Sequence, residues 1–225
     1  MPNARSQDFK LENMRGSFLN ILKPQKMEEN GVVKFRYNGT FLWPKSTAVL
    51  MGKTNDGKEL NVYEEAARVA TEQWGDKAAE WIKNGVIKSP FLDGDGPQGI
   101  SKKTGERHKG YEGHRFLRAS ANEDRQPQAF DDKRGADGKL VKVTDGSRLY
   151  SGAYYHIVVN LFAWEHAKNG KGLSVGLNMV QFARDGERLG GSGQANPDDF
   201  FEGVVDKGAA PAATQNGQGA AGLFA

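Results

Sequence analysis

The chain has 225 residues, a formal net charge of +3 and no cysteine. This length suffices for one domain with a sizeable core, and the lack of cysteine excludes a disulfide framework and thiolate zinc sites. This small net positive charge is compatible with an acidic partner. It is far below the net positive charge that would by itself indicate nucleic-acid binding. No run approaches the roughly 18 apolar residues of a membrane span, and the first ten residues, MPNARSQDFK, lack the apolar stretch of a signal peptide. We therefore expect a cytoplasmic protein that contacts no membrane.

Short strand-like segments, separated by turns rich in glycine, aspartate and asparagine, run through most of the chain. They are expected at residues 17–24, 33–43, 113–120, 151–166 and 172–183. The fold class is therefore mainly β (α+β). Five strands are also the number that an OB-fold β-barrel uses.

One helical region, at residues 61–85, interrupts the strands. Asn61 and Glu64 have the spacing of a capping box, and Gly85 marks the end of the region. Gly75 followed by Asp76 is expected to split the region into two helices, because glycine is a weak helix former and aspartate a good N-cap. An apolar stripe predicted to pack on the barrel comprises Leu60, Tyr63, Ala67, Ala70, Trp74, Ala78 and Trp81.

The last 18 residues, GAAPAATQNGQGAAGLFA, are small and uncharged. Such a segment buries too little apolar area to offset the entropy of ordering. We therefore expect a flexible N-terminal arm at residues 1–15, one OB-fold domain at 16–207 and a disordered tail at 208–225.

The strand expected at 151–166, SGAYYHIVVNLFAWEH, has two unlike faces. At the strand period of two, an ordinary core face comprises Tyr155, Ile157, Val159, Leu161 and Ala163. The opposite face comprises Tyr154, His156, Val158, Asn160, Phe162 and Trp164. We predict that the rings of this mixed face form part of a base-stacking platform.

Cations and aromatic rings alternate between residues 105 and 135. They comprise Arg107, Lys109, Tyr111, Arg115, Phe116, Arg118, Arg125, Phe130, Lys133 and Arg134. Lysine and arginine neutralise the phosphates of a single strand, and each ring that stacks on a base contributes about 1 to 3 kcal/mol. On the strand at 113–120, Leu117 and Ala119 are expected to point inward and His114, Phe116 and Arg118 outward. The alternative is that Phe116, Phe162 and Trp164 pack beneath the helical stripe.

The pattern of the strand at 33–43 predicts one face in the core and one charged face in solvent. Phe35, Tyr37, Phe41 and Trp43 share one face, which is predicted to be core. Lys34 and Arg36 share the other face with Asn38 and Thr40, and we expect the two cations to contact phosphates. The candidate DNA-binding residues are Lys34, Arg36, Arg107, Tyr111, His114, Arg115, Phe116, Arg118, Tyr154, His156, Phe162 and Trp164.

The sequence lacks the common catalytic and nucleotide-binding motifs. It has no GxxxxGK[ST], no GxSxG, no HExxH and no strand-GxGxxG-helix pattern. The acidic pairs Asp93/Asp95 and Asp131/Asp132 could hold a metal in a nuclease, but neither has EF-hand spacing. We expect no enzyme activity, no catalytic or metal-binding residue and no cofactor.

The order and spacing of several blocks resemble a known family. The blocks are GTFLWPK, ATEQWGDKAAEW, PFLDGDG, GYEGHRFLRASA, RQPQAFD, LYSGAYYHIVVNLFAW, NGKGLSVGLNMVQFARDGERLGG and DDFF, and they cover residues 16 to 203. They resemble the phage single-stranded-DNA-binding proteins, a family long described only as a domain of unknown function. The resemblance implies an OB-fold core and a non-enzymatic protein that coats single strands exposed in phage replication or recombination.

The sequence departs from the pattern of these phage proteins at its C-terminus. Proteins of this type often end in a strongly acidic tail that recruits replication proteins, whereas this chain has no acidic residue after Asp206. Recruitment of replication or recombination proteins would then depend on Leu223 and Phe224. Two competing hypotheses remain at this point: a metal-dependent nuclease or junction-resolving enzyme, and a phage structural or assembly protein.

Overall fold

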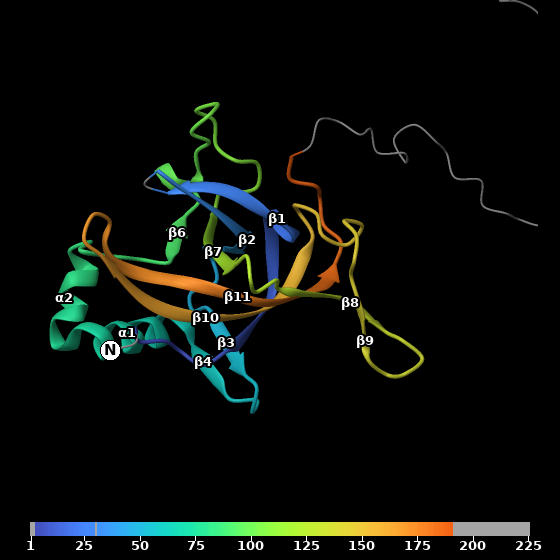
Figure 1. Cartoon of the computed structure of the whole chain (residues 1–225), viewed down its shortest axis with the longest axis horizontal. Helices are drawn as coiled ribbons and strands as arrows, with labels where there is room; N and C mark the ends of the chain where they lie inside the picture. Colours follow the sequence, from blue (N-terminus) through green and yellow to red (C-terminus); the bar gives the residue numbers. More distant parts are fainter. Residues whose placement is uncertain (1–2, 30, 191–225) are drawn as a thin grey trace, which may run out of the picture. The chain divides into compact units, whose positions relative to one another are not determined.

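The computed structural model describes residues 3–29 and 31–190 (Figure 1). Five strands close into a barrel: β1 (Phe9–Glu29), β2 (Val32–Pro44), β7 (His114–Asn122), β10 (Tyr154–His166) and β11 (Gly170–Arg184). Around the ring, β1 pairs with β2, β2 with β7, β11 with β10, and β10 with β1, all antiparallel. The pair β7–β11 is parallel. This closed five-stranded ring confirms the expected OB-fold-like barrel, and each of its strands overlaps one of the predicted segments.

Shorter elements decorate the barrel. They are β3 (Met51–Thr54), β4 (Glu59–Asn61), β5 (Ile87–Lys88), β6 (Phe91–Asp93), β8 (Gln128–Arg134), β9 (Leu140–Lys142) and the 3₁₀ turns η1 (Gly75–Lys77) and η2 (Pro97–Gly99). The β3–β4 hairpin extends the sheet at β1, whereas β6 pairs with β7 and β8 pairs with β11. Most of these strands are too short to give a period that could be recognised in the sequence.

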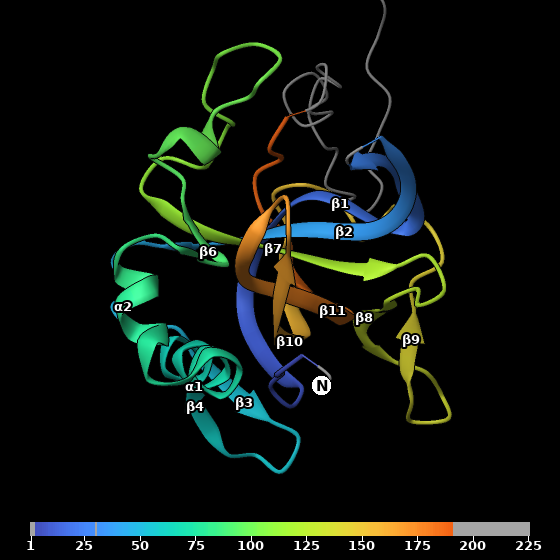
Figure 2. The same cartoon turned by 60° about the vertical axis from the view of Figure 1, so that its left-hand side comes forward.

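The helical insertion has the predicted break. Helix α1 (Val62–Trp74) ends at Gly75, whose φ is 71°, and α2 (Ala78–Lys83) follows the turn η1. The side chain of Asn61 accepts hydrogen bonds from the backbone N–H groups of Tyr63 and Glu64, as expected of an N-cap. Figure 2 shows both helices at one side of the barrel. The buried face of the helices differs in part from the predicted stripe, since Ala67 is exposed and the buried residues are Val62, Ala66, Val69, Ala70 and Ala78.

The core follows the strand period most clearly on β10. Every second residue from Tyr155 to Ala163 is almost completely buried, and the alternate residues are half-buried. The two-faced interpretation of this strand is therefore confirmed. Tyr155 also closes the neighbouring turn, because its hydroxyl accepts from the N–H of Tyr150 and lies within donating distance of the carbonyl oxygens of Arg148 and Tyr150, each at 2.9 Å.

The N-terminal segment is part of the fold. Residues 9–15 of β1 pair with β10 and β3, while Ala4 and Ser6 are buried, and the N–H of Ser6 donates to the carbonyl oxygen of Leu161 at 2.8 Å. The expectation of a flexible arm at 1–15 is therefore wrong for these residues, because backbone pairing with β10 holds them. The predicted tail at 208–225 lies outside the described residues.

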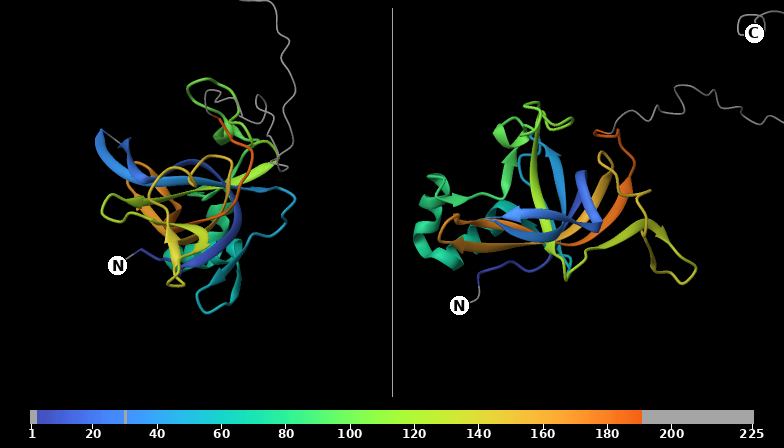
Figure 3. Two further views of the ribbon diagram at one scale, coloured as in Figure 1. Left: turned by 90° about the vertical axis from the view of Figure 1, so that its right-hand side faces the viewer. Right: turned by 45° about the horizontal axis from the view of Figure 1, so that its top comes forward.

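The end of the β1–β2 hairpin extends past the barrel (Figure 3). Pairing between β2 and β7 stops at Arg36 and Asn122, so the hairpin residues before Arg36 have no third strand beside them. Phe35 lies in this part and is 41% exposed, which corrects its assignment to the core. Within the described residues, no helix has the length and apolar character needed to span a membrane.

Candidate nucleic-acid interface

Four hollows on the outer surface of the barrel share lining residues, so they lie next to one another. The first hollow is lined mainly by the connection before β7, the second by β1, β2 and β7, the third by β2 and the turn after β7, and the fourth mainly by β7, β10 and β11. His108 and Arg118 line both the first and the second hollow, and Lys34 lines both the second and the third. Arg36 lines the second, the third and the fourth. The hollows have volumes between about 440 and 740 Å³. We call these four hollows together the β2–β7 groove, because they extend across the outer faces of these two strands.

The register of β2 and β7 places the polar side chains of the groove. Thr40 lies beside Arg118, Asn38 beside Ser120, and Arg36 beside Asn122. Residues directly opposite one another on paired strands point to the same side of the sheet. The strand period therefore gathers these side chains on the outer face, while the alternate residues Phe41, Leu117 and Ala119 are buried.

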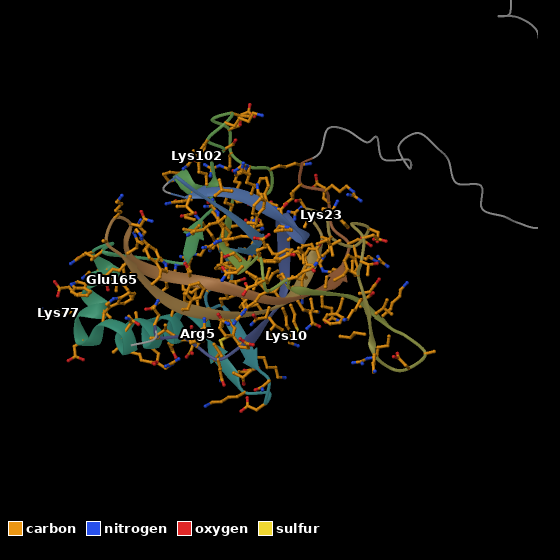
Figure 4. All side chains as sticks on the ribbon, viewed as in Figure 1. Arg5, Lys10, Lys23, Lys77, Lys102 and Glu165 are labelled. Atoms are coloured by element: carbon orange, nitrogen blue, oxygen red, sulfur yellow. The ribbon has the colours of Figure 1, made fainter. Side chains whose placement is uncertain are left out.

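Most of the charged side chains that line the groove are positive. Its cations are Arg5, Lys34, Arg36, Lys102, Lys103, Arg118 and Arg125, and its acidic residues are Glu28, Glu123 and Asp124. Arg5 and Lys102, which line the fourth and the first hollow, are labelled in Figure 4. A row of cations along an open groove is the arrangement that attracts a phosphate backbone.

Side-chain amides in the second hollow are fixed by hydrogen bonds to one another. Asn20 Nδ2 donates to Asn38 Oδ1 at 3.0 Å, and Asn38 Nδ2 donates to Gln25 Oε1 at 3.2 Å. These residues come from β1 and β2, where the register shifts between Asn20 and Gln25. The hollow therefore combines cations with amides whose orientation is set in advance.

Of the residues predicted from the sequence, the structure brings four to the groove. Lys34 and Arg36 lie on β2, Arg118 lies on β7, and Phe162 lies on β10 in the fourth hollow together with Arg5. Residues 5 and 162 are also joined by an isolated β-bridge. These four predicted residues come from three separate strands.

Two predicted arginines and one predicted histidine line none of the four hollows. Arg107 donates to the carbonyl oxygens of Gly94 and Asp95, so it fixes the connection between β6 and β7. His114 Nδ1 lies 2.7 Å from the carbonyl oxygen of Glu112. Arg115 lies at the start of β7, next to Trp43 and Asp93 in the sheet register.

Two predicted stacking rings are buried, which corrects their interpretation. Tyr111 is 1% exposed and Phe116 is 0% exposed, and both pack with Leu42 in a small second core. Phe116 was expected to point outward from β7. The connection before β7 covers this face of the strand through Tyr111, so Phe116 is inaccessible, whereas Leu117 is buried on the opposite face in the main core. Burial also raises the pKa of the Tyr111 hydroxyl.

The other three residues of the expected platform on β10 lie apart from the groove. The guanidinium of Arg184 stacks on Tyr154, 3.3 Å from the ring centroid, and Lys88 lies 5.8 Å from the ring centroid of Trp164. His156 Nδ1 lies 3.4 Å from the backbone nitrogen of Asn13, and burial lowers its pKa. Phe162 is therefore the one member of the predicted set of β10 rings that lines the groove.

Sequence reasoning missed several residues of the groove. Lys102 and Lys103 lie just before the cation-rich segment that begins at residue 105 and could have been included on charge, whereas His108 lies within that segment. Phe18 gave no signal, because its exposure depends on an irregularity of β1 rather than on the strand period.

Three of the four aspartates in the acidic pairs form ion pairs with basic side chains. Lys45 Nζ lies 2.6 Å from Asp93 Oδ1 and 2.7 Å from Asp95 Oδ2, and these hydrogen bonds lower the pKa of both carboxyl groups. Asp131 pairs with Arg148 at 3.2 Å. No group of three or more histidine or acidic side chains suited to a metal ion occurs in the part of the chain that the structure describes.

Oligonucleotide-binding barrels of the OB type use the face of their second and third strands, together with the loop between the first two. In this barrel those strands are β2 and β7, and the groove crosses them beside the β1–β2 hairpin. The fold and the groove therefore define an OB-fold protein of the nucleic-acid-binding class.

Comparison with known proteins gives the family. The family model of the ssDNA-binding protein of Enterobacter phage Enc34 matches residues 7–210, so the chain belongs to this family. Protein p50 of Acyrthosiphon pisum secondary endosymbiont phage 1 is 32% identical over 196 residues, which are 85% of this chain and 91% of that protein.

Two solved structures are similar in fold. The single-stranded DNA-binding protein from bacteriophage Enc34, with a C-terminal truncation, is 19% identical, with a TM-score of 0.50 over 84% of this chain and 94% of that one. The structure of the Enc34 protein in complex with ssDNA is 17% identical, with a TM-score of 0.48 over 81% of this chain and 89% of that one. The first of these similarities agrees with the OB-fold assignment.

Proposed function

We propose that this protein binds single-stranded DNA without sequence selection and protects it during phage DNA replication and recombination. The observation that carries the proposal is the set of adjacent hollows in the β2–β7 groove, with the cations that line them. Contacts of lysine and arginine with phosphates do not depend on base identity. Membership in a family described by an ssDNA-binding protein supports the same conclusion.

The shape of the groove favours a single strand over a duplex. Its lining residues come from the connection before β7, from β1, β2 and β7, and from β10 and β11. A strand must bend to follow this path over the curved barrel. Duplex DNA is stiff, with a persistence length of about 50 nm, so bending it over one small protein is costly, whereas an unpaired strand is flexible.

The proposal includes a non-enzymatic role. In the nuclease hypothesis, Asp93 and Asp95 would bind a divalent metal, but in this structure Lys45 forms ion pairs with both carboxylates. The site of action would be the host cytoplasm, where phage DNA is copied. For replication or recombination partners the proposal relies on sequence alone, since Leu223 and Phe224 of the tail lie outside the described residues.

Fluorescence anisotropy with labelled oligonucleotides tests the function. We expect tighter binding to an unpaired strand than to a blunt duplex of equal length, with an affinity that falls steeply as salt rises, because bound cations release counterions from the phosphates. Removal of divalent metal with EDTA should leave the affinity unchanged. Equal affinity for the duplex at moderate salt would contradict the proposal, and cleavage of the strand in magnesium would support the nuclease hypothesis instead.

A further inference from the structure

Phe18 is placed at the groove by an irregularity in β1. Ser17 pairs with Thr40 and Asn20 pairs with Asn38, so Phe18 and Leu19 together oppose the single residue Gly39. This is the two-against-one arrangement of a β-bulge, which reverses the alternation of side chains along the strand. Leu19 consequently packs against the core and Phe18 faces outward.

Glycine at position 39 provides the space for this arrangement. A Cβ atom there would lie 3.0 Å from Leu19 Cδ2 and 2.9 Å from Phe41 Cζ. A larger residue would therefore press on the side chain of Leu19, the neighbour of Phe18 in the bulge. Gly39 therefore leaves room for Leu19 on the inner side of the bulge.

The backbone of Phe18 is strained. Its φ of 49° lies in the left-handed region, which large non-glycine residues rarely adopt. Two side chains hold this conformation: Ser151 Oγ accepts from the N–H of Phe18 at 3.0 Å, and Asn20 Nδ2 donates to its carbonyl oxygen at 3.3 Å. Strain that is held in this way points to a function of the residue, since glycine would fit the position without it.

The ring of Phe18 is open to solvent but anchored along one side. It is 52% exposed, and its centroid lies 4.9 Å from that of His108 in an edge-to-face contact. His108 lies 5.2 Å from Tyr111, and Tyr111 lies 5.0 Å from Phe116, which is buried. A row of four aromatic rings therefore leads from the core to the surface of the groove and ends at Phe18.

The surroundings of this ring fit an unpaired base. Phe18 and His108 line the second hollow together with Lys34, Arg36 and Arg118. Cations in the same hollow would hold the phosphates of a strand, and an exposed ring in that hollow offers its face to a base of any sequence. We propose that Phe18, supported by His108, is a nucleobase-stacking site of the β2–β7 groove.

Replacement of Phe18 by glycine tests this inference, which presupposes the proposed function. Phe18→Gly removes the ring and relieves the strained backbone, so the melting temperature should stay close to that of the natural chain. The affinity for oligothymidylate should fall about 5- to 150-fold, the range expected for loss of one stacked base. The affinity for an abasic strand of the same length should not change, because phosphate contacts remain.

Two control variants complete the design. Phe18→Tyr keeps a ring and should bind oligothymidylate as the natural chain does. Val49→Gly removes an exposed apolar side chain that lines none of the four hollows, and it should leave binding unchanged. An oligonucleotide with 5-iodouracil should cross-link to the peptide that contains Phe18, which tests the site without any substitution.

The outcomes separate the inference from the proposed function. If the natural chain binds neither oligothymidylate nor the abasic strand, the proposed function itself is wrong. If the natural chain binds oligothymidylate and Phe18→Gly binds it equally well, the stacking site is wrong while the function stands. Cross-linking confined to other peptides would likewise overturn the inference.

Discussion

Arg115 and Arg118 lie three residues apart on β7, and both are exposed. Arg118 lines two hollows of the groove, whereas Arg115 lines none of the four. Residues three apart on a strand point to opposite sides, so the period of two placed Arg118 on the predicted outward face and Arg115 on the face of Leu117, although both arginines were candidates. The closure of the barrel and the position of the β6–β7 connection decide between them.

This pair gives a matched prediction about DNA affinity. Arg118→Ala should lower the affinity for single strands about fivefold at low salt and reduce the slope of log K against log salt by about 0.7, the value for one lost phosphate contact. Arg115→Ala should leave both quantities unchanged. Anisotropy titrations at four salt concentrations would measure them, with melting curves to check the fold. A larger effect for Arg115 would mean that the strand follows another path.

At the scale of elements, the connection between β6 and β7 is held by close backbone contacts. A Cβ atom at Gly99 would lie 2.0 Å from the carbonyl oxygen of Gly94, and a Cβ atom at Gly94 would lie 2.1 Å from that of Tyr111. These contacts and the hydrogen bonds of Arg107 fix a segment without long regular structure. The segment carries Lys102, Lys103 and His108 into the groove.

Substitution in this segment should therefore affect stability and binding together. Gly99→Ala forces the backbone apart and should lower the free energy of unfolding by about 1 to 3 kcal/mol, as overpacking does. Because cations of the groove would shift, the affinity for single strands should also fall. Gly146→Ala is the control, since a Cβ there would meet nothing within 4 Å. Urea unfolding and anisotropy would check both effects, and a Gly99→Ala protein with unchanged stability would show that the contact relaxes freely.

At the scale of the whole molecule, acid should weaken the attachment of the β6 region to the barrel. Lys45 follows β2 and pairs with Asp93 at the end of β6 and with Asp95 just beyond it. The pKa of each carboxyl is lowered in the folded state, mainly by the hydrogen bond from Lys45. A lowered folded pKa contributes stability that is present above the unfolded pKa, near 4, and is lost as the pH falls through the folded pKa.

The melting temperature of the natural chain should consequently fall as the pH drops below about 4. Lys45→Met removes the cause of the lowered pKa values, so its melting temperature should fall less over the same interval. Lys83→Met, on α2, serves as a control because the pKa of neither aspartate depends on it. Scanning calorimetry between pH 6 and pH 2 would measure the difference. Parallel curves for the natural chain and Lys45→Met would contradict this account.

Sequence alone determined the features that depend on local period and local capping. The five barrel strands, the helical region with its break at Gly75 and the buried face of β10 follow from spacing that is visible in the chain. Lys34 and Arg36 were also placed on the outer face of their strand by the period of two. The family was identified from ordered blocks, and the match over residues 7–210 confirms it.

Only the tertiary structure decided which of the candidate side chains share one surface. Tyr111 and Phe116 became core because the connection that precedes β7 folds back over the start of that strand, and Arg107 became structural because Gly94 and Asp95 lie beside it. Phe18 reached the groove because one extra residue in β1 reverses the alternation there. Local period fixes which face of a strand a side chain occupies, but whether that face is open or covered depends on how the other segments of the chain pack over it.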